Sequence, residues 1–326
     1  MDRRAFLGTM AGSLLAAPAA AEAQQAGKVY RIGYLAGWSR QAHDYELERA
    51  LGRLGWILSQ NLHVEYRWTE GKYERYAPLA AELVRLKPDV IVAPQTAAAL
   101  AAQKATSSIP IVMVFIAEPV GLGLVRSLAR PGGNITGTTL WGGWEIFAKQ
   151  LQLLREVAPG VSRVAVLWNP ANRPAHALVL KSVDAAARSM WIDLHPQGVQ
   201  TRDELEAAFA TIVQAGAGAL LEISDVLFFT HRARLAELAI RSRLPTMVGL
   251  RQSVEAGGLM HYGSTSSEML QRAATMVDKI LRGADPAVLP VEEPTKFELT
   301  INLKTAKALG LTIPPSLLLR ADQVIE

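Results

Sequence analysis

The residues most able to hold a small molecule lie in short loops that follow predicted strands. They supply hydroxyl, amide and carboxylate groups for hydrogen bonds, and indole rings for stacking. These candidate ligand-binding residues are Trp38, Ser39, Gln95, Thr96, Glu118, Trp141, Asn169, Ser224 and Asp225. We predict that they surround one binding site for a small organic molecule.

Four of these residues have a specific chemical interpretation. Thr96 precedes a predicted helix, 97–105, so its hydroxyl and the amides beyond it suit a ligand carboxylate, although a plain N-cap explains Thr96 equally well. Asp225 would bind a ligand amine or cap the helix that follows. Trp38 and Trp141 would either stack on a flat ligand or fill the core.

The chain contains no motif for catalysis, metal binding or cofactor binding. It lacks a P-loop and a Gly-x-Ser-x-Gly elbow, and Gly121-Leu122-Gly123 lacks the third glycine of a dinucleotide fingerprint. The six histidines have no metal-ligand spacing, and there is no cysteine for a disulfide or a thiolate site. We therefore predict no catalytic residue, no metal, no cofactor and no enzymatic activity.

The elements that must position these loops form two series. Strands are predicted at 29–35, 62–68, 90–93 and 111–115, and again at 163–168, 192–195, 219–223 and 246–248, with amphipathic helices between them. This alternation indicates parallel sheets covered by helices. The passage 119–137 between the two series is rich in glycine, and we predict no regular element there.

Two such series predict an α/β protein of two Rossmann-like lobes with a cleft between them. Lobe 1 is expected to comprise residues 24–118 plus about 262–292, and lobe 2 about 139–258 plus about 297–326, because the last third is too short for a third domain. Ligands of parallel sheets bind beyond the carboxyl ends of the strands. The cleft should therefore collect the candidate loops of both lobes.

Residues 1–23 predict an export signal of the twin-arginine type. Arg3 and Arg4 precede a weakly apolar stretch, and Ala21-Glu22-Ala23 is a small-x-small cleavage pattern. Beyond the signal, no charge-free run reaches the roughly 20 residues that cross a bilayer. We predict a soluble periplasmic protein without a membrane anchor. The net charge of +4 is spread without a basic block, which argues against a nucleic-acid partner.

Several segments resemble the tryptophan/tyrosine-binding-like group of ABC transporter substrate-binding proteins. They are EYRWTEG (65–71), AAELV (80–84), PIV (110–112), EPVG (118–121), LARPGGNITG (128–137), EAGGLMHYG (255–263), PTKFEL (294–299) and NLKTAKALGL (302–311). The resemblance covers essentially the whole chain after the signal. It implies a type I periplasmic-binding-protein fold, with three chain crossings that form a hinge.

The resemblance also implies a function. An exported solute-binding protein of this kind captures an amino acid or a small carboxylate-like molecule and delivers it to the permease and ATPase of an ABC transporter. Two alternatives remain open from the sequence: a sensory module that presents its ligand to a membrane receptor or kinase, and an exported enzyme on the same fold. A neighbouring gene for a sensor kinase would favour the sensory module, and turnover of a ligand would reveal an enzyme.

Overall fold

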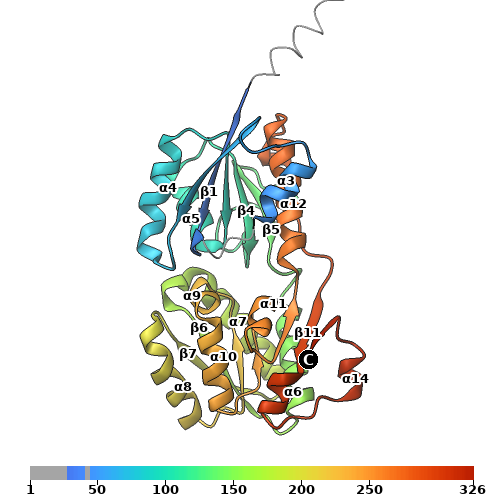
Figure 1. The fold of residues 1–326 in the computed structure, drawn as a ribbon. Helices are drawn as coiled ribbons and strands as arrows, with labels where there is room; N and C mark the ends of the chain where they lie inside the picture. Colours follow the sequence, from blue (N-terminus) through green and yellow to red (C-terminus); the bar gives the residue numbers. More distant parts are fainter. Residues whose placement is uncertain (1–27, 41–44) are drawn as a thin grey trace, which may run out of the picture.

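The structure is a computed structural model that describes residues 28–40 and 45–326. Two α/β lobes lie one above the other, with the chain passing between them along one side (Figure 1). The predicted export signal, residues 1–23, lies outside the described residues. Within the described ranges, no helix is both long and apolar enough to cross a membrane.

The first lobe contains a five-stranded parallel sheet in the order β2-β1-β3-β4-β5. Its strands are β1 (Tyr30–Ala36), β2 (Leu62–Trp68), β3 (Val90–Pro94), β4 (Ile111–Ile116) and β5 (Ile135–Thr139). The helices around it are α3 (Glu46–Arg53), α4 (Tyr76–Arg85), α5 (Thr96–Ala105) and α12 (Ser266–Leu281). Because side chains alternate along a strand, Ile32 and Tyr34 pack with α3 and α12, whereas Leu35 packs with α4 and α5.

The second lobe contains a seven-stranded sheet in the order β12-β11-β10-β9-β8-β6-β7. Its strands are β6 (Arg163–Trp168), β7 (Asp193–Gly198), β8 (Ala219–Glu222), β9 (Thr246–Met247), β10 (Met260–Gly263), β11 (Glu298–Asn302) and β12 (Gln323–Ile325). Side chains of α6 (Glu145–Val157) and α7 (Arg173–Ser189) pack on one face. Those of α8 (Leu205–Gln214) and α10 (Arg232–Arg241) pack on the other.

The remaining helices are short and lie mainly at the edges of the lobes. They are α9 (Val226–Thr230), α11 (Arg251–Glu255), α13 (Leu303–Ala308) and α14 (Pro315–Leu318), with the 3₁₀ turns η2 (Tyr73–Arg75), η3 (Pro170–Asn172), η4 (Arg202–Glu204) and η5 (Pro286–Val288). The segment that follows Asp225 thus forms two helices, α9 and α10.

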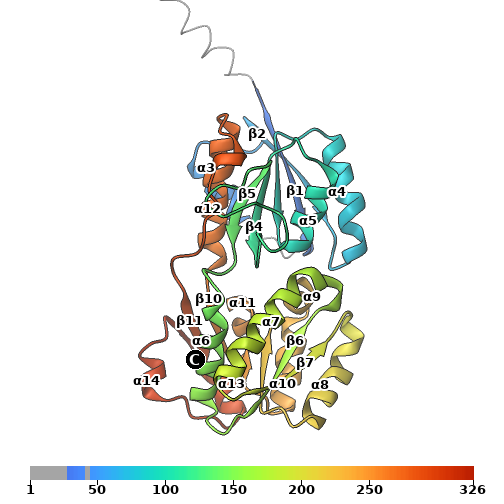
Figure 2. The same ribbon diagram turned by 180° about the vertical axis from the view of Figure 1, so that it is seen from behind.

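The chain crosses between the sheets three times, as Figure 2 shows. It leaves the first lobe after β5, returns after β10 to form α12, and leaves again before β11. The hydroxyl of Ser264 donates to the carbonyl of Leu140 at 2.9 Å, which ties the first crossing to the second. The predicted three-crossing hinge is therefore confirmed.

One strand pair departs from the predicted parallel arrangement. β10 and β11 are antiparallel, whereas the other neighbouring strands in the described part of the chain are parallel. The reason is the route of the chain. β10 runs toward the first lobe, and β11 runs away from it after the third crossing.

The glycine-rich passage 119–137 contains the start of a regular element, contrary to the prediction. β5 begins at Ile135 and pairs with β4 at the edge of the first sheet. Gly137 makes this pairing possible because its φ is 145°, and a Cβ there would overlap the carbonyl of Met113. Glycine serves here to let two strands approach closely.

Candidate functional site

A cleft lies between the two lobes, at the carboxyl ends of strands from both sheets. The space between its walls is about 1040 Å³, including the part open to solvent. Aromatic side chains dominate the walls and come from both lobes: Trp38, Tyr73, Tyr76, Phe115, Trp141 and Phe229. Asp225 is the one lining residue of the described chain that carries a formal charge at neutral pH, since burial keeps His176 neutral. The cleft is therefore an apolar, largely aromatic space with one acidic group.

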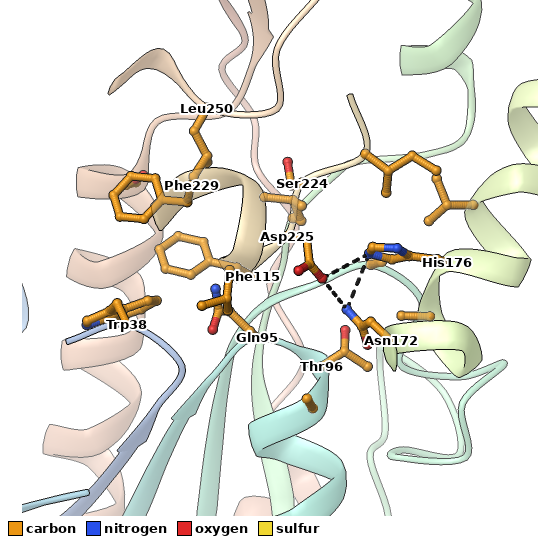
Figure 3. A pocket seen from close by; sticks show the side chains of 18 of the residues that line it. Trp38, Gln95, Thr96, Phe115, Asn172, His176, Ser224, Asp225, Phe229 and Leu250 are labelled. Atoms are coloured by element: carbon orange, nitrogen blue, oxygen red, sulfur yellow. Dashed lines mark hydrogen bonds and ion pairs between the residues drawn. The ribbon is translucent and has the colours of Figure 1, made fainter. Parts of the chain in front are cut away.

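Six of the nine candidate residues line this cleft. They are Trp38, Gln95, Thr96, Trp141, Ser224 and Asp225. Figure 3 shows Trp38, Gln95 and Thr96 from the first lobe facing Ser224 and Asp225 from the second. The structure thus brings together loops that are up to 187 residues apart, the separation of Trp38 and Asp225.

The other three candidates, Ser39, Glu118 and Asn169, do not line the cleft. Glu118 turns back on its own loop, where its Oε1 accepts a 3.2 Å hydrogen bond from the Gly121 N–H. Asn169 is buried behind the wall and contacts Asp225. Ser39 is half-buried beside Trp38 but does not face the enclosed space. In this structure these three residues therefore lie outside the lining of the cleft, and a role for them in ligand binding stays a prediction.

Asp225 is the centre of a hydrogen-bond network in the second lobe. Its Oδ1 accepts from Asn169 Nδ2 at 2.8 Å and from the Leu227 N–H at 3.0 Å. Its Oδ2 accepts from Asn172 Nδ2 at 3.2 Å and lies 3.5 Å from His176 Nε2. The bond to Leu227 caps α9, so the capping role predicted as one alternative is present.

His176 is buried and electrically neutral. The Asn169 N–H donates to His176 Nδ1 at 3.0 Å, so the proton of the neutral ring lies on Nε2, facing Asp225. Burial lowers the pKa of His176, and the charge of Asp225 only partly opposes this. The ring therefore orients the Asp225 carboxylate without neutralising its charge.

One hydrogen bond of this network crosses the cleft. The Tyr73 hydroxyl, from the first lobe, donates to Asp225 Oδ2 at 2.5 Å. Burial, together with the adjacent carboxylate, raises the pKa of the Tyr73 phenol, so the phenol keeps its proton and remains the donor. The lobes are in contact at the site, and a side chain of each contributes to the bond.

The N-terminus of α5 faces the cleft without a side-chain cap. The N-cap residue is Gln95, not Thr96 as predicted, and its side chain makes no capping hydrogen bond. Thr96 is the first helical residue and is 5% exposed, and no described residue pairs with its hydroxyl. The free N–H groups of a first helical turn and the helix dipole favour an anionic group. This corner of the cleft therefore suits a carboxylate.

Two adjacent strands end in strained residues that face the cleft. Gln95, after β3, has φ 76°, and Phe115, near the end of β4, has φ 61°. Positive φ is unfavourable for residues with a side chain, and such strain gathers at functional sites. The register of β4 against β5 shifts between Met113 and Ile116, which accommodates the turn at Phe115. Both side chains lie in the wall of the site as a result.

Several lining residues had no sequence signal strong enough to predict them. Tyr73 begins η2 and Tyr76 begins α4, and in the sequence their spacing is that of one amphipathic helix. Asn172 and His176 are four residues apart at the start of α7, a spacing that puts both on one helical face. This spacing was the one sequence feature that could have predicted Asn172 and His176 as lining residues. It could not be used from the sequence alone, because the direction of α7 relative to the cleft was not known.

The described residues contain no group of three or more His, Asp and Glu side chains that could hold a metal ion. The chain matches the family model of the ABC transporter substrate binding proteins over residues 34–325. The tyrosine-binding protein of Clostridioides difficile (strain R20291) is 26% identical over 263 residues, which cover 81% of this chain and 75% of that protein.

Solved structures agree with this match. An ABC domain from Streptococcus pneumonia in complex with L-Trp is 25% identical and has a TM-score of 0.84, with 91% of this chain and all of that chain covered. A conserved domain protein from Vibrio cholerae is 25% identical with a TM-score of 0.85 over the same shares. A ligand-free, open substrate-binding protein from Clostridium difficile, at 24% identity and a TM-score of 0.66, shares the fold over 91% of this chain and 99% of that chain.

Proposed function

This chain belongs to the ABC transporter substrate-binding protein family, and we propose that it captures a small organic ligand outside the cytoplasmic membrane and passes it to an ABC permease. The observation that carries this proposal is the cleft, whose walls are supplied by loops of both lobes. A ligand held by both walls stabilises the closed form relative to the open form. The permease would then distinguish the loaded protein by its shape.

The chemistry of the walls suggests how the ligand is held. A ligand carboxylate at the α5 N-terminus would accept hydrogen bonds from the Thr96 hydroxyl and the first free amides. An apolar or aromatic body would lie against Trp38 and Trp141. A cationic group would lie on the side of Asp225. Ligands of this shape include amino acids; one relative is named a tyrosine-binding protein, and a similar structure was solved in complex with L-Trp.

The export signal predicted from the sequence fits the same role. The twin-arginine signal pattern of residues 1–23 would deliver the folded protein to the periplasm. We propose that the protein works there without an anchor, beside the permease and ATPase of its transporter.

A thermal-shift screen of the purified protein tests the proposed function. The panel contains the twenty amino acids, their N-methylated and deaminated derivatives, aromatic acids and other small carboxylates. A true ligand raises Tm progressively with its concentration, because it binds the folded state only. Absence of any concentration-dependent responder across this panel would overturn the proposal.

A further inference from the structure

The Asp225 carboxylate has no hydrogen-bonding capacity left for a ligand. A carboxylate offers roughly four lone-pair positions on its two oxygens. Asn169 and the Leu227 N–H occupy those of Oδ1, and Tyr73 and Asn172 occupy those of Oδ2. The side chain is fully buried in this arrangement. An ammonium N–H could reach Asp225 only by displacing one of these donors.

The negative charge of Asp225 is nevertheless uncompensated. Its four donors are neutral amide, phenol and backbone groups, and the neighbouring His176 is neutral because burial lowers its pKa. None of the described residues that line the cleft is a lysine or an arginine. A buried charge without a counter-charge is unfavourable, so the cleft favours a cation that supplies one.

Aromatic rings line the same cleft as this charge. Figure 3 shows Phe115 and Phe229 on one side of Asp225, with Trp38 farther along the same cleft. The negative face of an aromatic ring attracts a cation without any hydrogen bond, and most strongly when the cation is shielded from water. Charge attraction and ring faces together can hold a cation that has no N–H group.

We infer that the cationic group this cleft selects is a fully N-alkylated ammonium, as in a betaine of an aromatic amino acid, and not a primary ammonium. The inference rests on the proposed function and names its ligand class. A quaternary ammonium needs no acceptor from Asp225 and leaves the Tyr73 and Asn172 bonds in place. A primary ammonium must break one of those bonds or leave its own N–H groups unpaired, and both are unfavourable.

Two probes that differ only in N-methylation test the inference. Titration calorimetry with L-tryptophan and with N,N,N-trimethyl-L-tryptophan should give at least about tenfold tighter binding of the trimethylated compound. The amide oxygens of Gln95 and Gln252 are buried acceptors without a protein partner. If they bind the N–H groups of a primary amine, L-tryptophan will bind equally or more tightly, and the inference is overturned.

If neither L-tryptophan nor its trimethylated derivative binds, the inference is also overturned. The proposed function is then tested by the wider thermal-shift panel. The variant Trp38→Leu should weaken binding of the trimethylated probe by about tenfold. The matched control is Trp191→Leu, whose side chain is 93% exposed on the second lobe; it should bind normally.

The charge is tested separately by Asp225→Asn. Binding of the trimethylated probe should fall more than tenfold, whereas indole-3-propanoate, which carries no cation, should bind no more weakly than before. An equal loss for both compounds would mean that the substitution only disturbs the cleft. The Trp38→Leu result decides the matter if the Asp225→Asn variant does not fold.

Discussion

Tyr73 and Asp225 are joined by a 2.5 Å hydrogen bond that runs from η2 in the first lobe to the N-cap of α9 in the second. The donor and the acceptor lie 152 residues apart in sequence and belong to different sheets of the fold. The bond therefore exists only while the lobes are together. It links the closed arrangement directly to the acidic group of the site.

Tyr73→Phe should shift the lobes toward the open arrangement. A hydrogen bond to a charged group contributes about 1.5–3 kcal/mol, so the closed-to-open ratio should fall by about tenfold or more. Small-angle scattering should show a larger radius of gyration without ligand, and ligand affinity should fall. Tyr30→Phe removes a hydroxyl at the start of β1, at the end of the sheet away from the cleft, and is the matched control. Equal radii for the two variants would contradict this prediction.

Gly37→Ala should prevent the lobes from closing while each lobe stays folded. A Cβ at Gly37 would overlap Val226 of the opposite lobe and the Tyr76 hydroxyl. Ligand affinity should fall at least about tenfold, because the overlap with Val226 arises only in the closed form. The overlap with Tyr76 lies within the first lobe, and rotation of that flexible side chain should keep the change in Tm small. Gly52→Ala, where nothing lies within 4 Å, is the control and should bind normally. Unimpaired binding by the Gly37→Ala variant would show that the lobes do not meet here.

Thr96→Ala should weaken binding of a carboxylate ligand without unfolding the protein. The lost hydroxyl bond corresponds to about 1–2 kcal/mol, or roughly 5- to 30-fold in Kd. Thr96→Ser should restore affinity, since it keeps the hydroxyl. Thr275→Ala, in α12, removes a hydroxyl that bonds only within its own helix and should have no effect on Kd. Calorimetry with the best responder of the thermal-shift panel measures all three.

Glu222→Gln should remove a pH dependence of stability. Burial raises the pKa of Glu222 to about 8 in the folded protein, from an ordinary value of 4.5. A folded-state pKa above the unfolded one means that the stability is fully present below pH 4.5 and is lost as the pH rises through 8. This loss is on the order of 4 kcal/mol by pH 8.

Urea unfolding at about pH 5 and about pH 8, on either side of most of this loss, measures the effect. The Glu222→Gln variant should lose less stability than the wild type between the two pH values, because its amide does not ionise. The exposed Glu293→Gln is the control and should keep the wild-type dependence. If the stability of the Glu222→Gln variant depends on pH as that of the wild type does, Glu222 does not have a raised pKa in the folded protein.

Gly137→Ala should destabilise the first lobe severely. The new Cβ would overlap the Met113 carbonyl at a φ of 145°, so β5 could not pair with β4 as it does. We expect a loss of at least about 3 kcal/mol. Gly133→Ala lies four residues away in open space and should leave denaturant stability within about 0.5 kcal/mol of the wild type. Similar stability of the two variants would contradict the role given to Gly137.

The position of the site followed from the sequence because parallel strands place their following loops on one edge. Trp38, Thr96 and Asp225 each stand directly after such a strand, and each lines the cleft. Tyr73 could not be predicted in the same way, because it precedes a helix and reaches the cleft only through the packing of the lobes. Glu118 lies outside the lining for a local reason, since its carboxylate accepts a hydrogen bond within its own turn.

The fold itself followed from the alternation of strands and helices, but the reversal of β11 did not. The apolar pattern of a short buried strand is the same in either direction. The direction of β11 is set by the third crossing, and that crossing depends on where the connecting residues 264–297 pack. The same limit applied to Gly137, whose conformation is fixed by its neighbour across the sheet and not by the residues beside it in the chain.

The helix α12 belongs to the first lobe, although its residues are made after almost all of the second. A nascent chain that ends at β10 would leave the face of the sheet that holds Ile32 and Tyr34 covered by α3 alone. The core of the first lobe is therefore incomplete until α12 has been synthesised. Separate expression of the amino-terminal half should yield aggregated material, and any attempt to graft one lobe onto another scaffold must carry α12 with it.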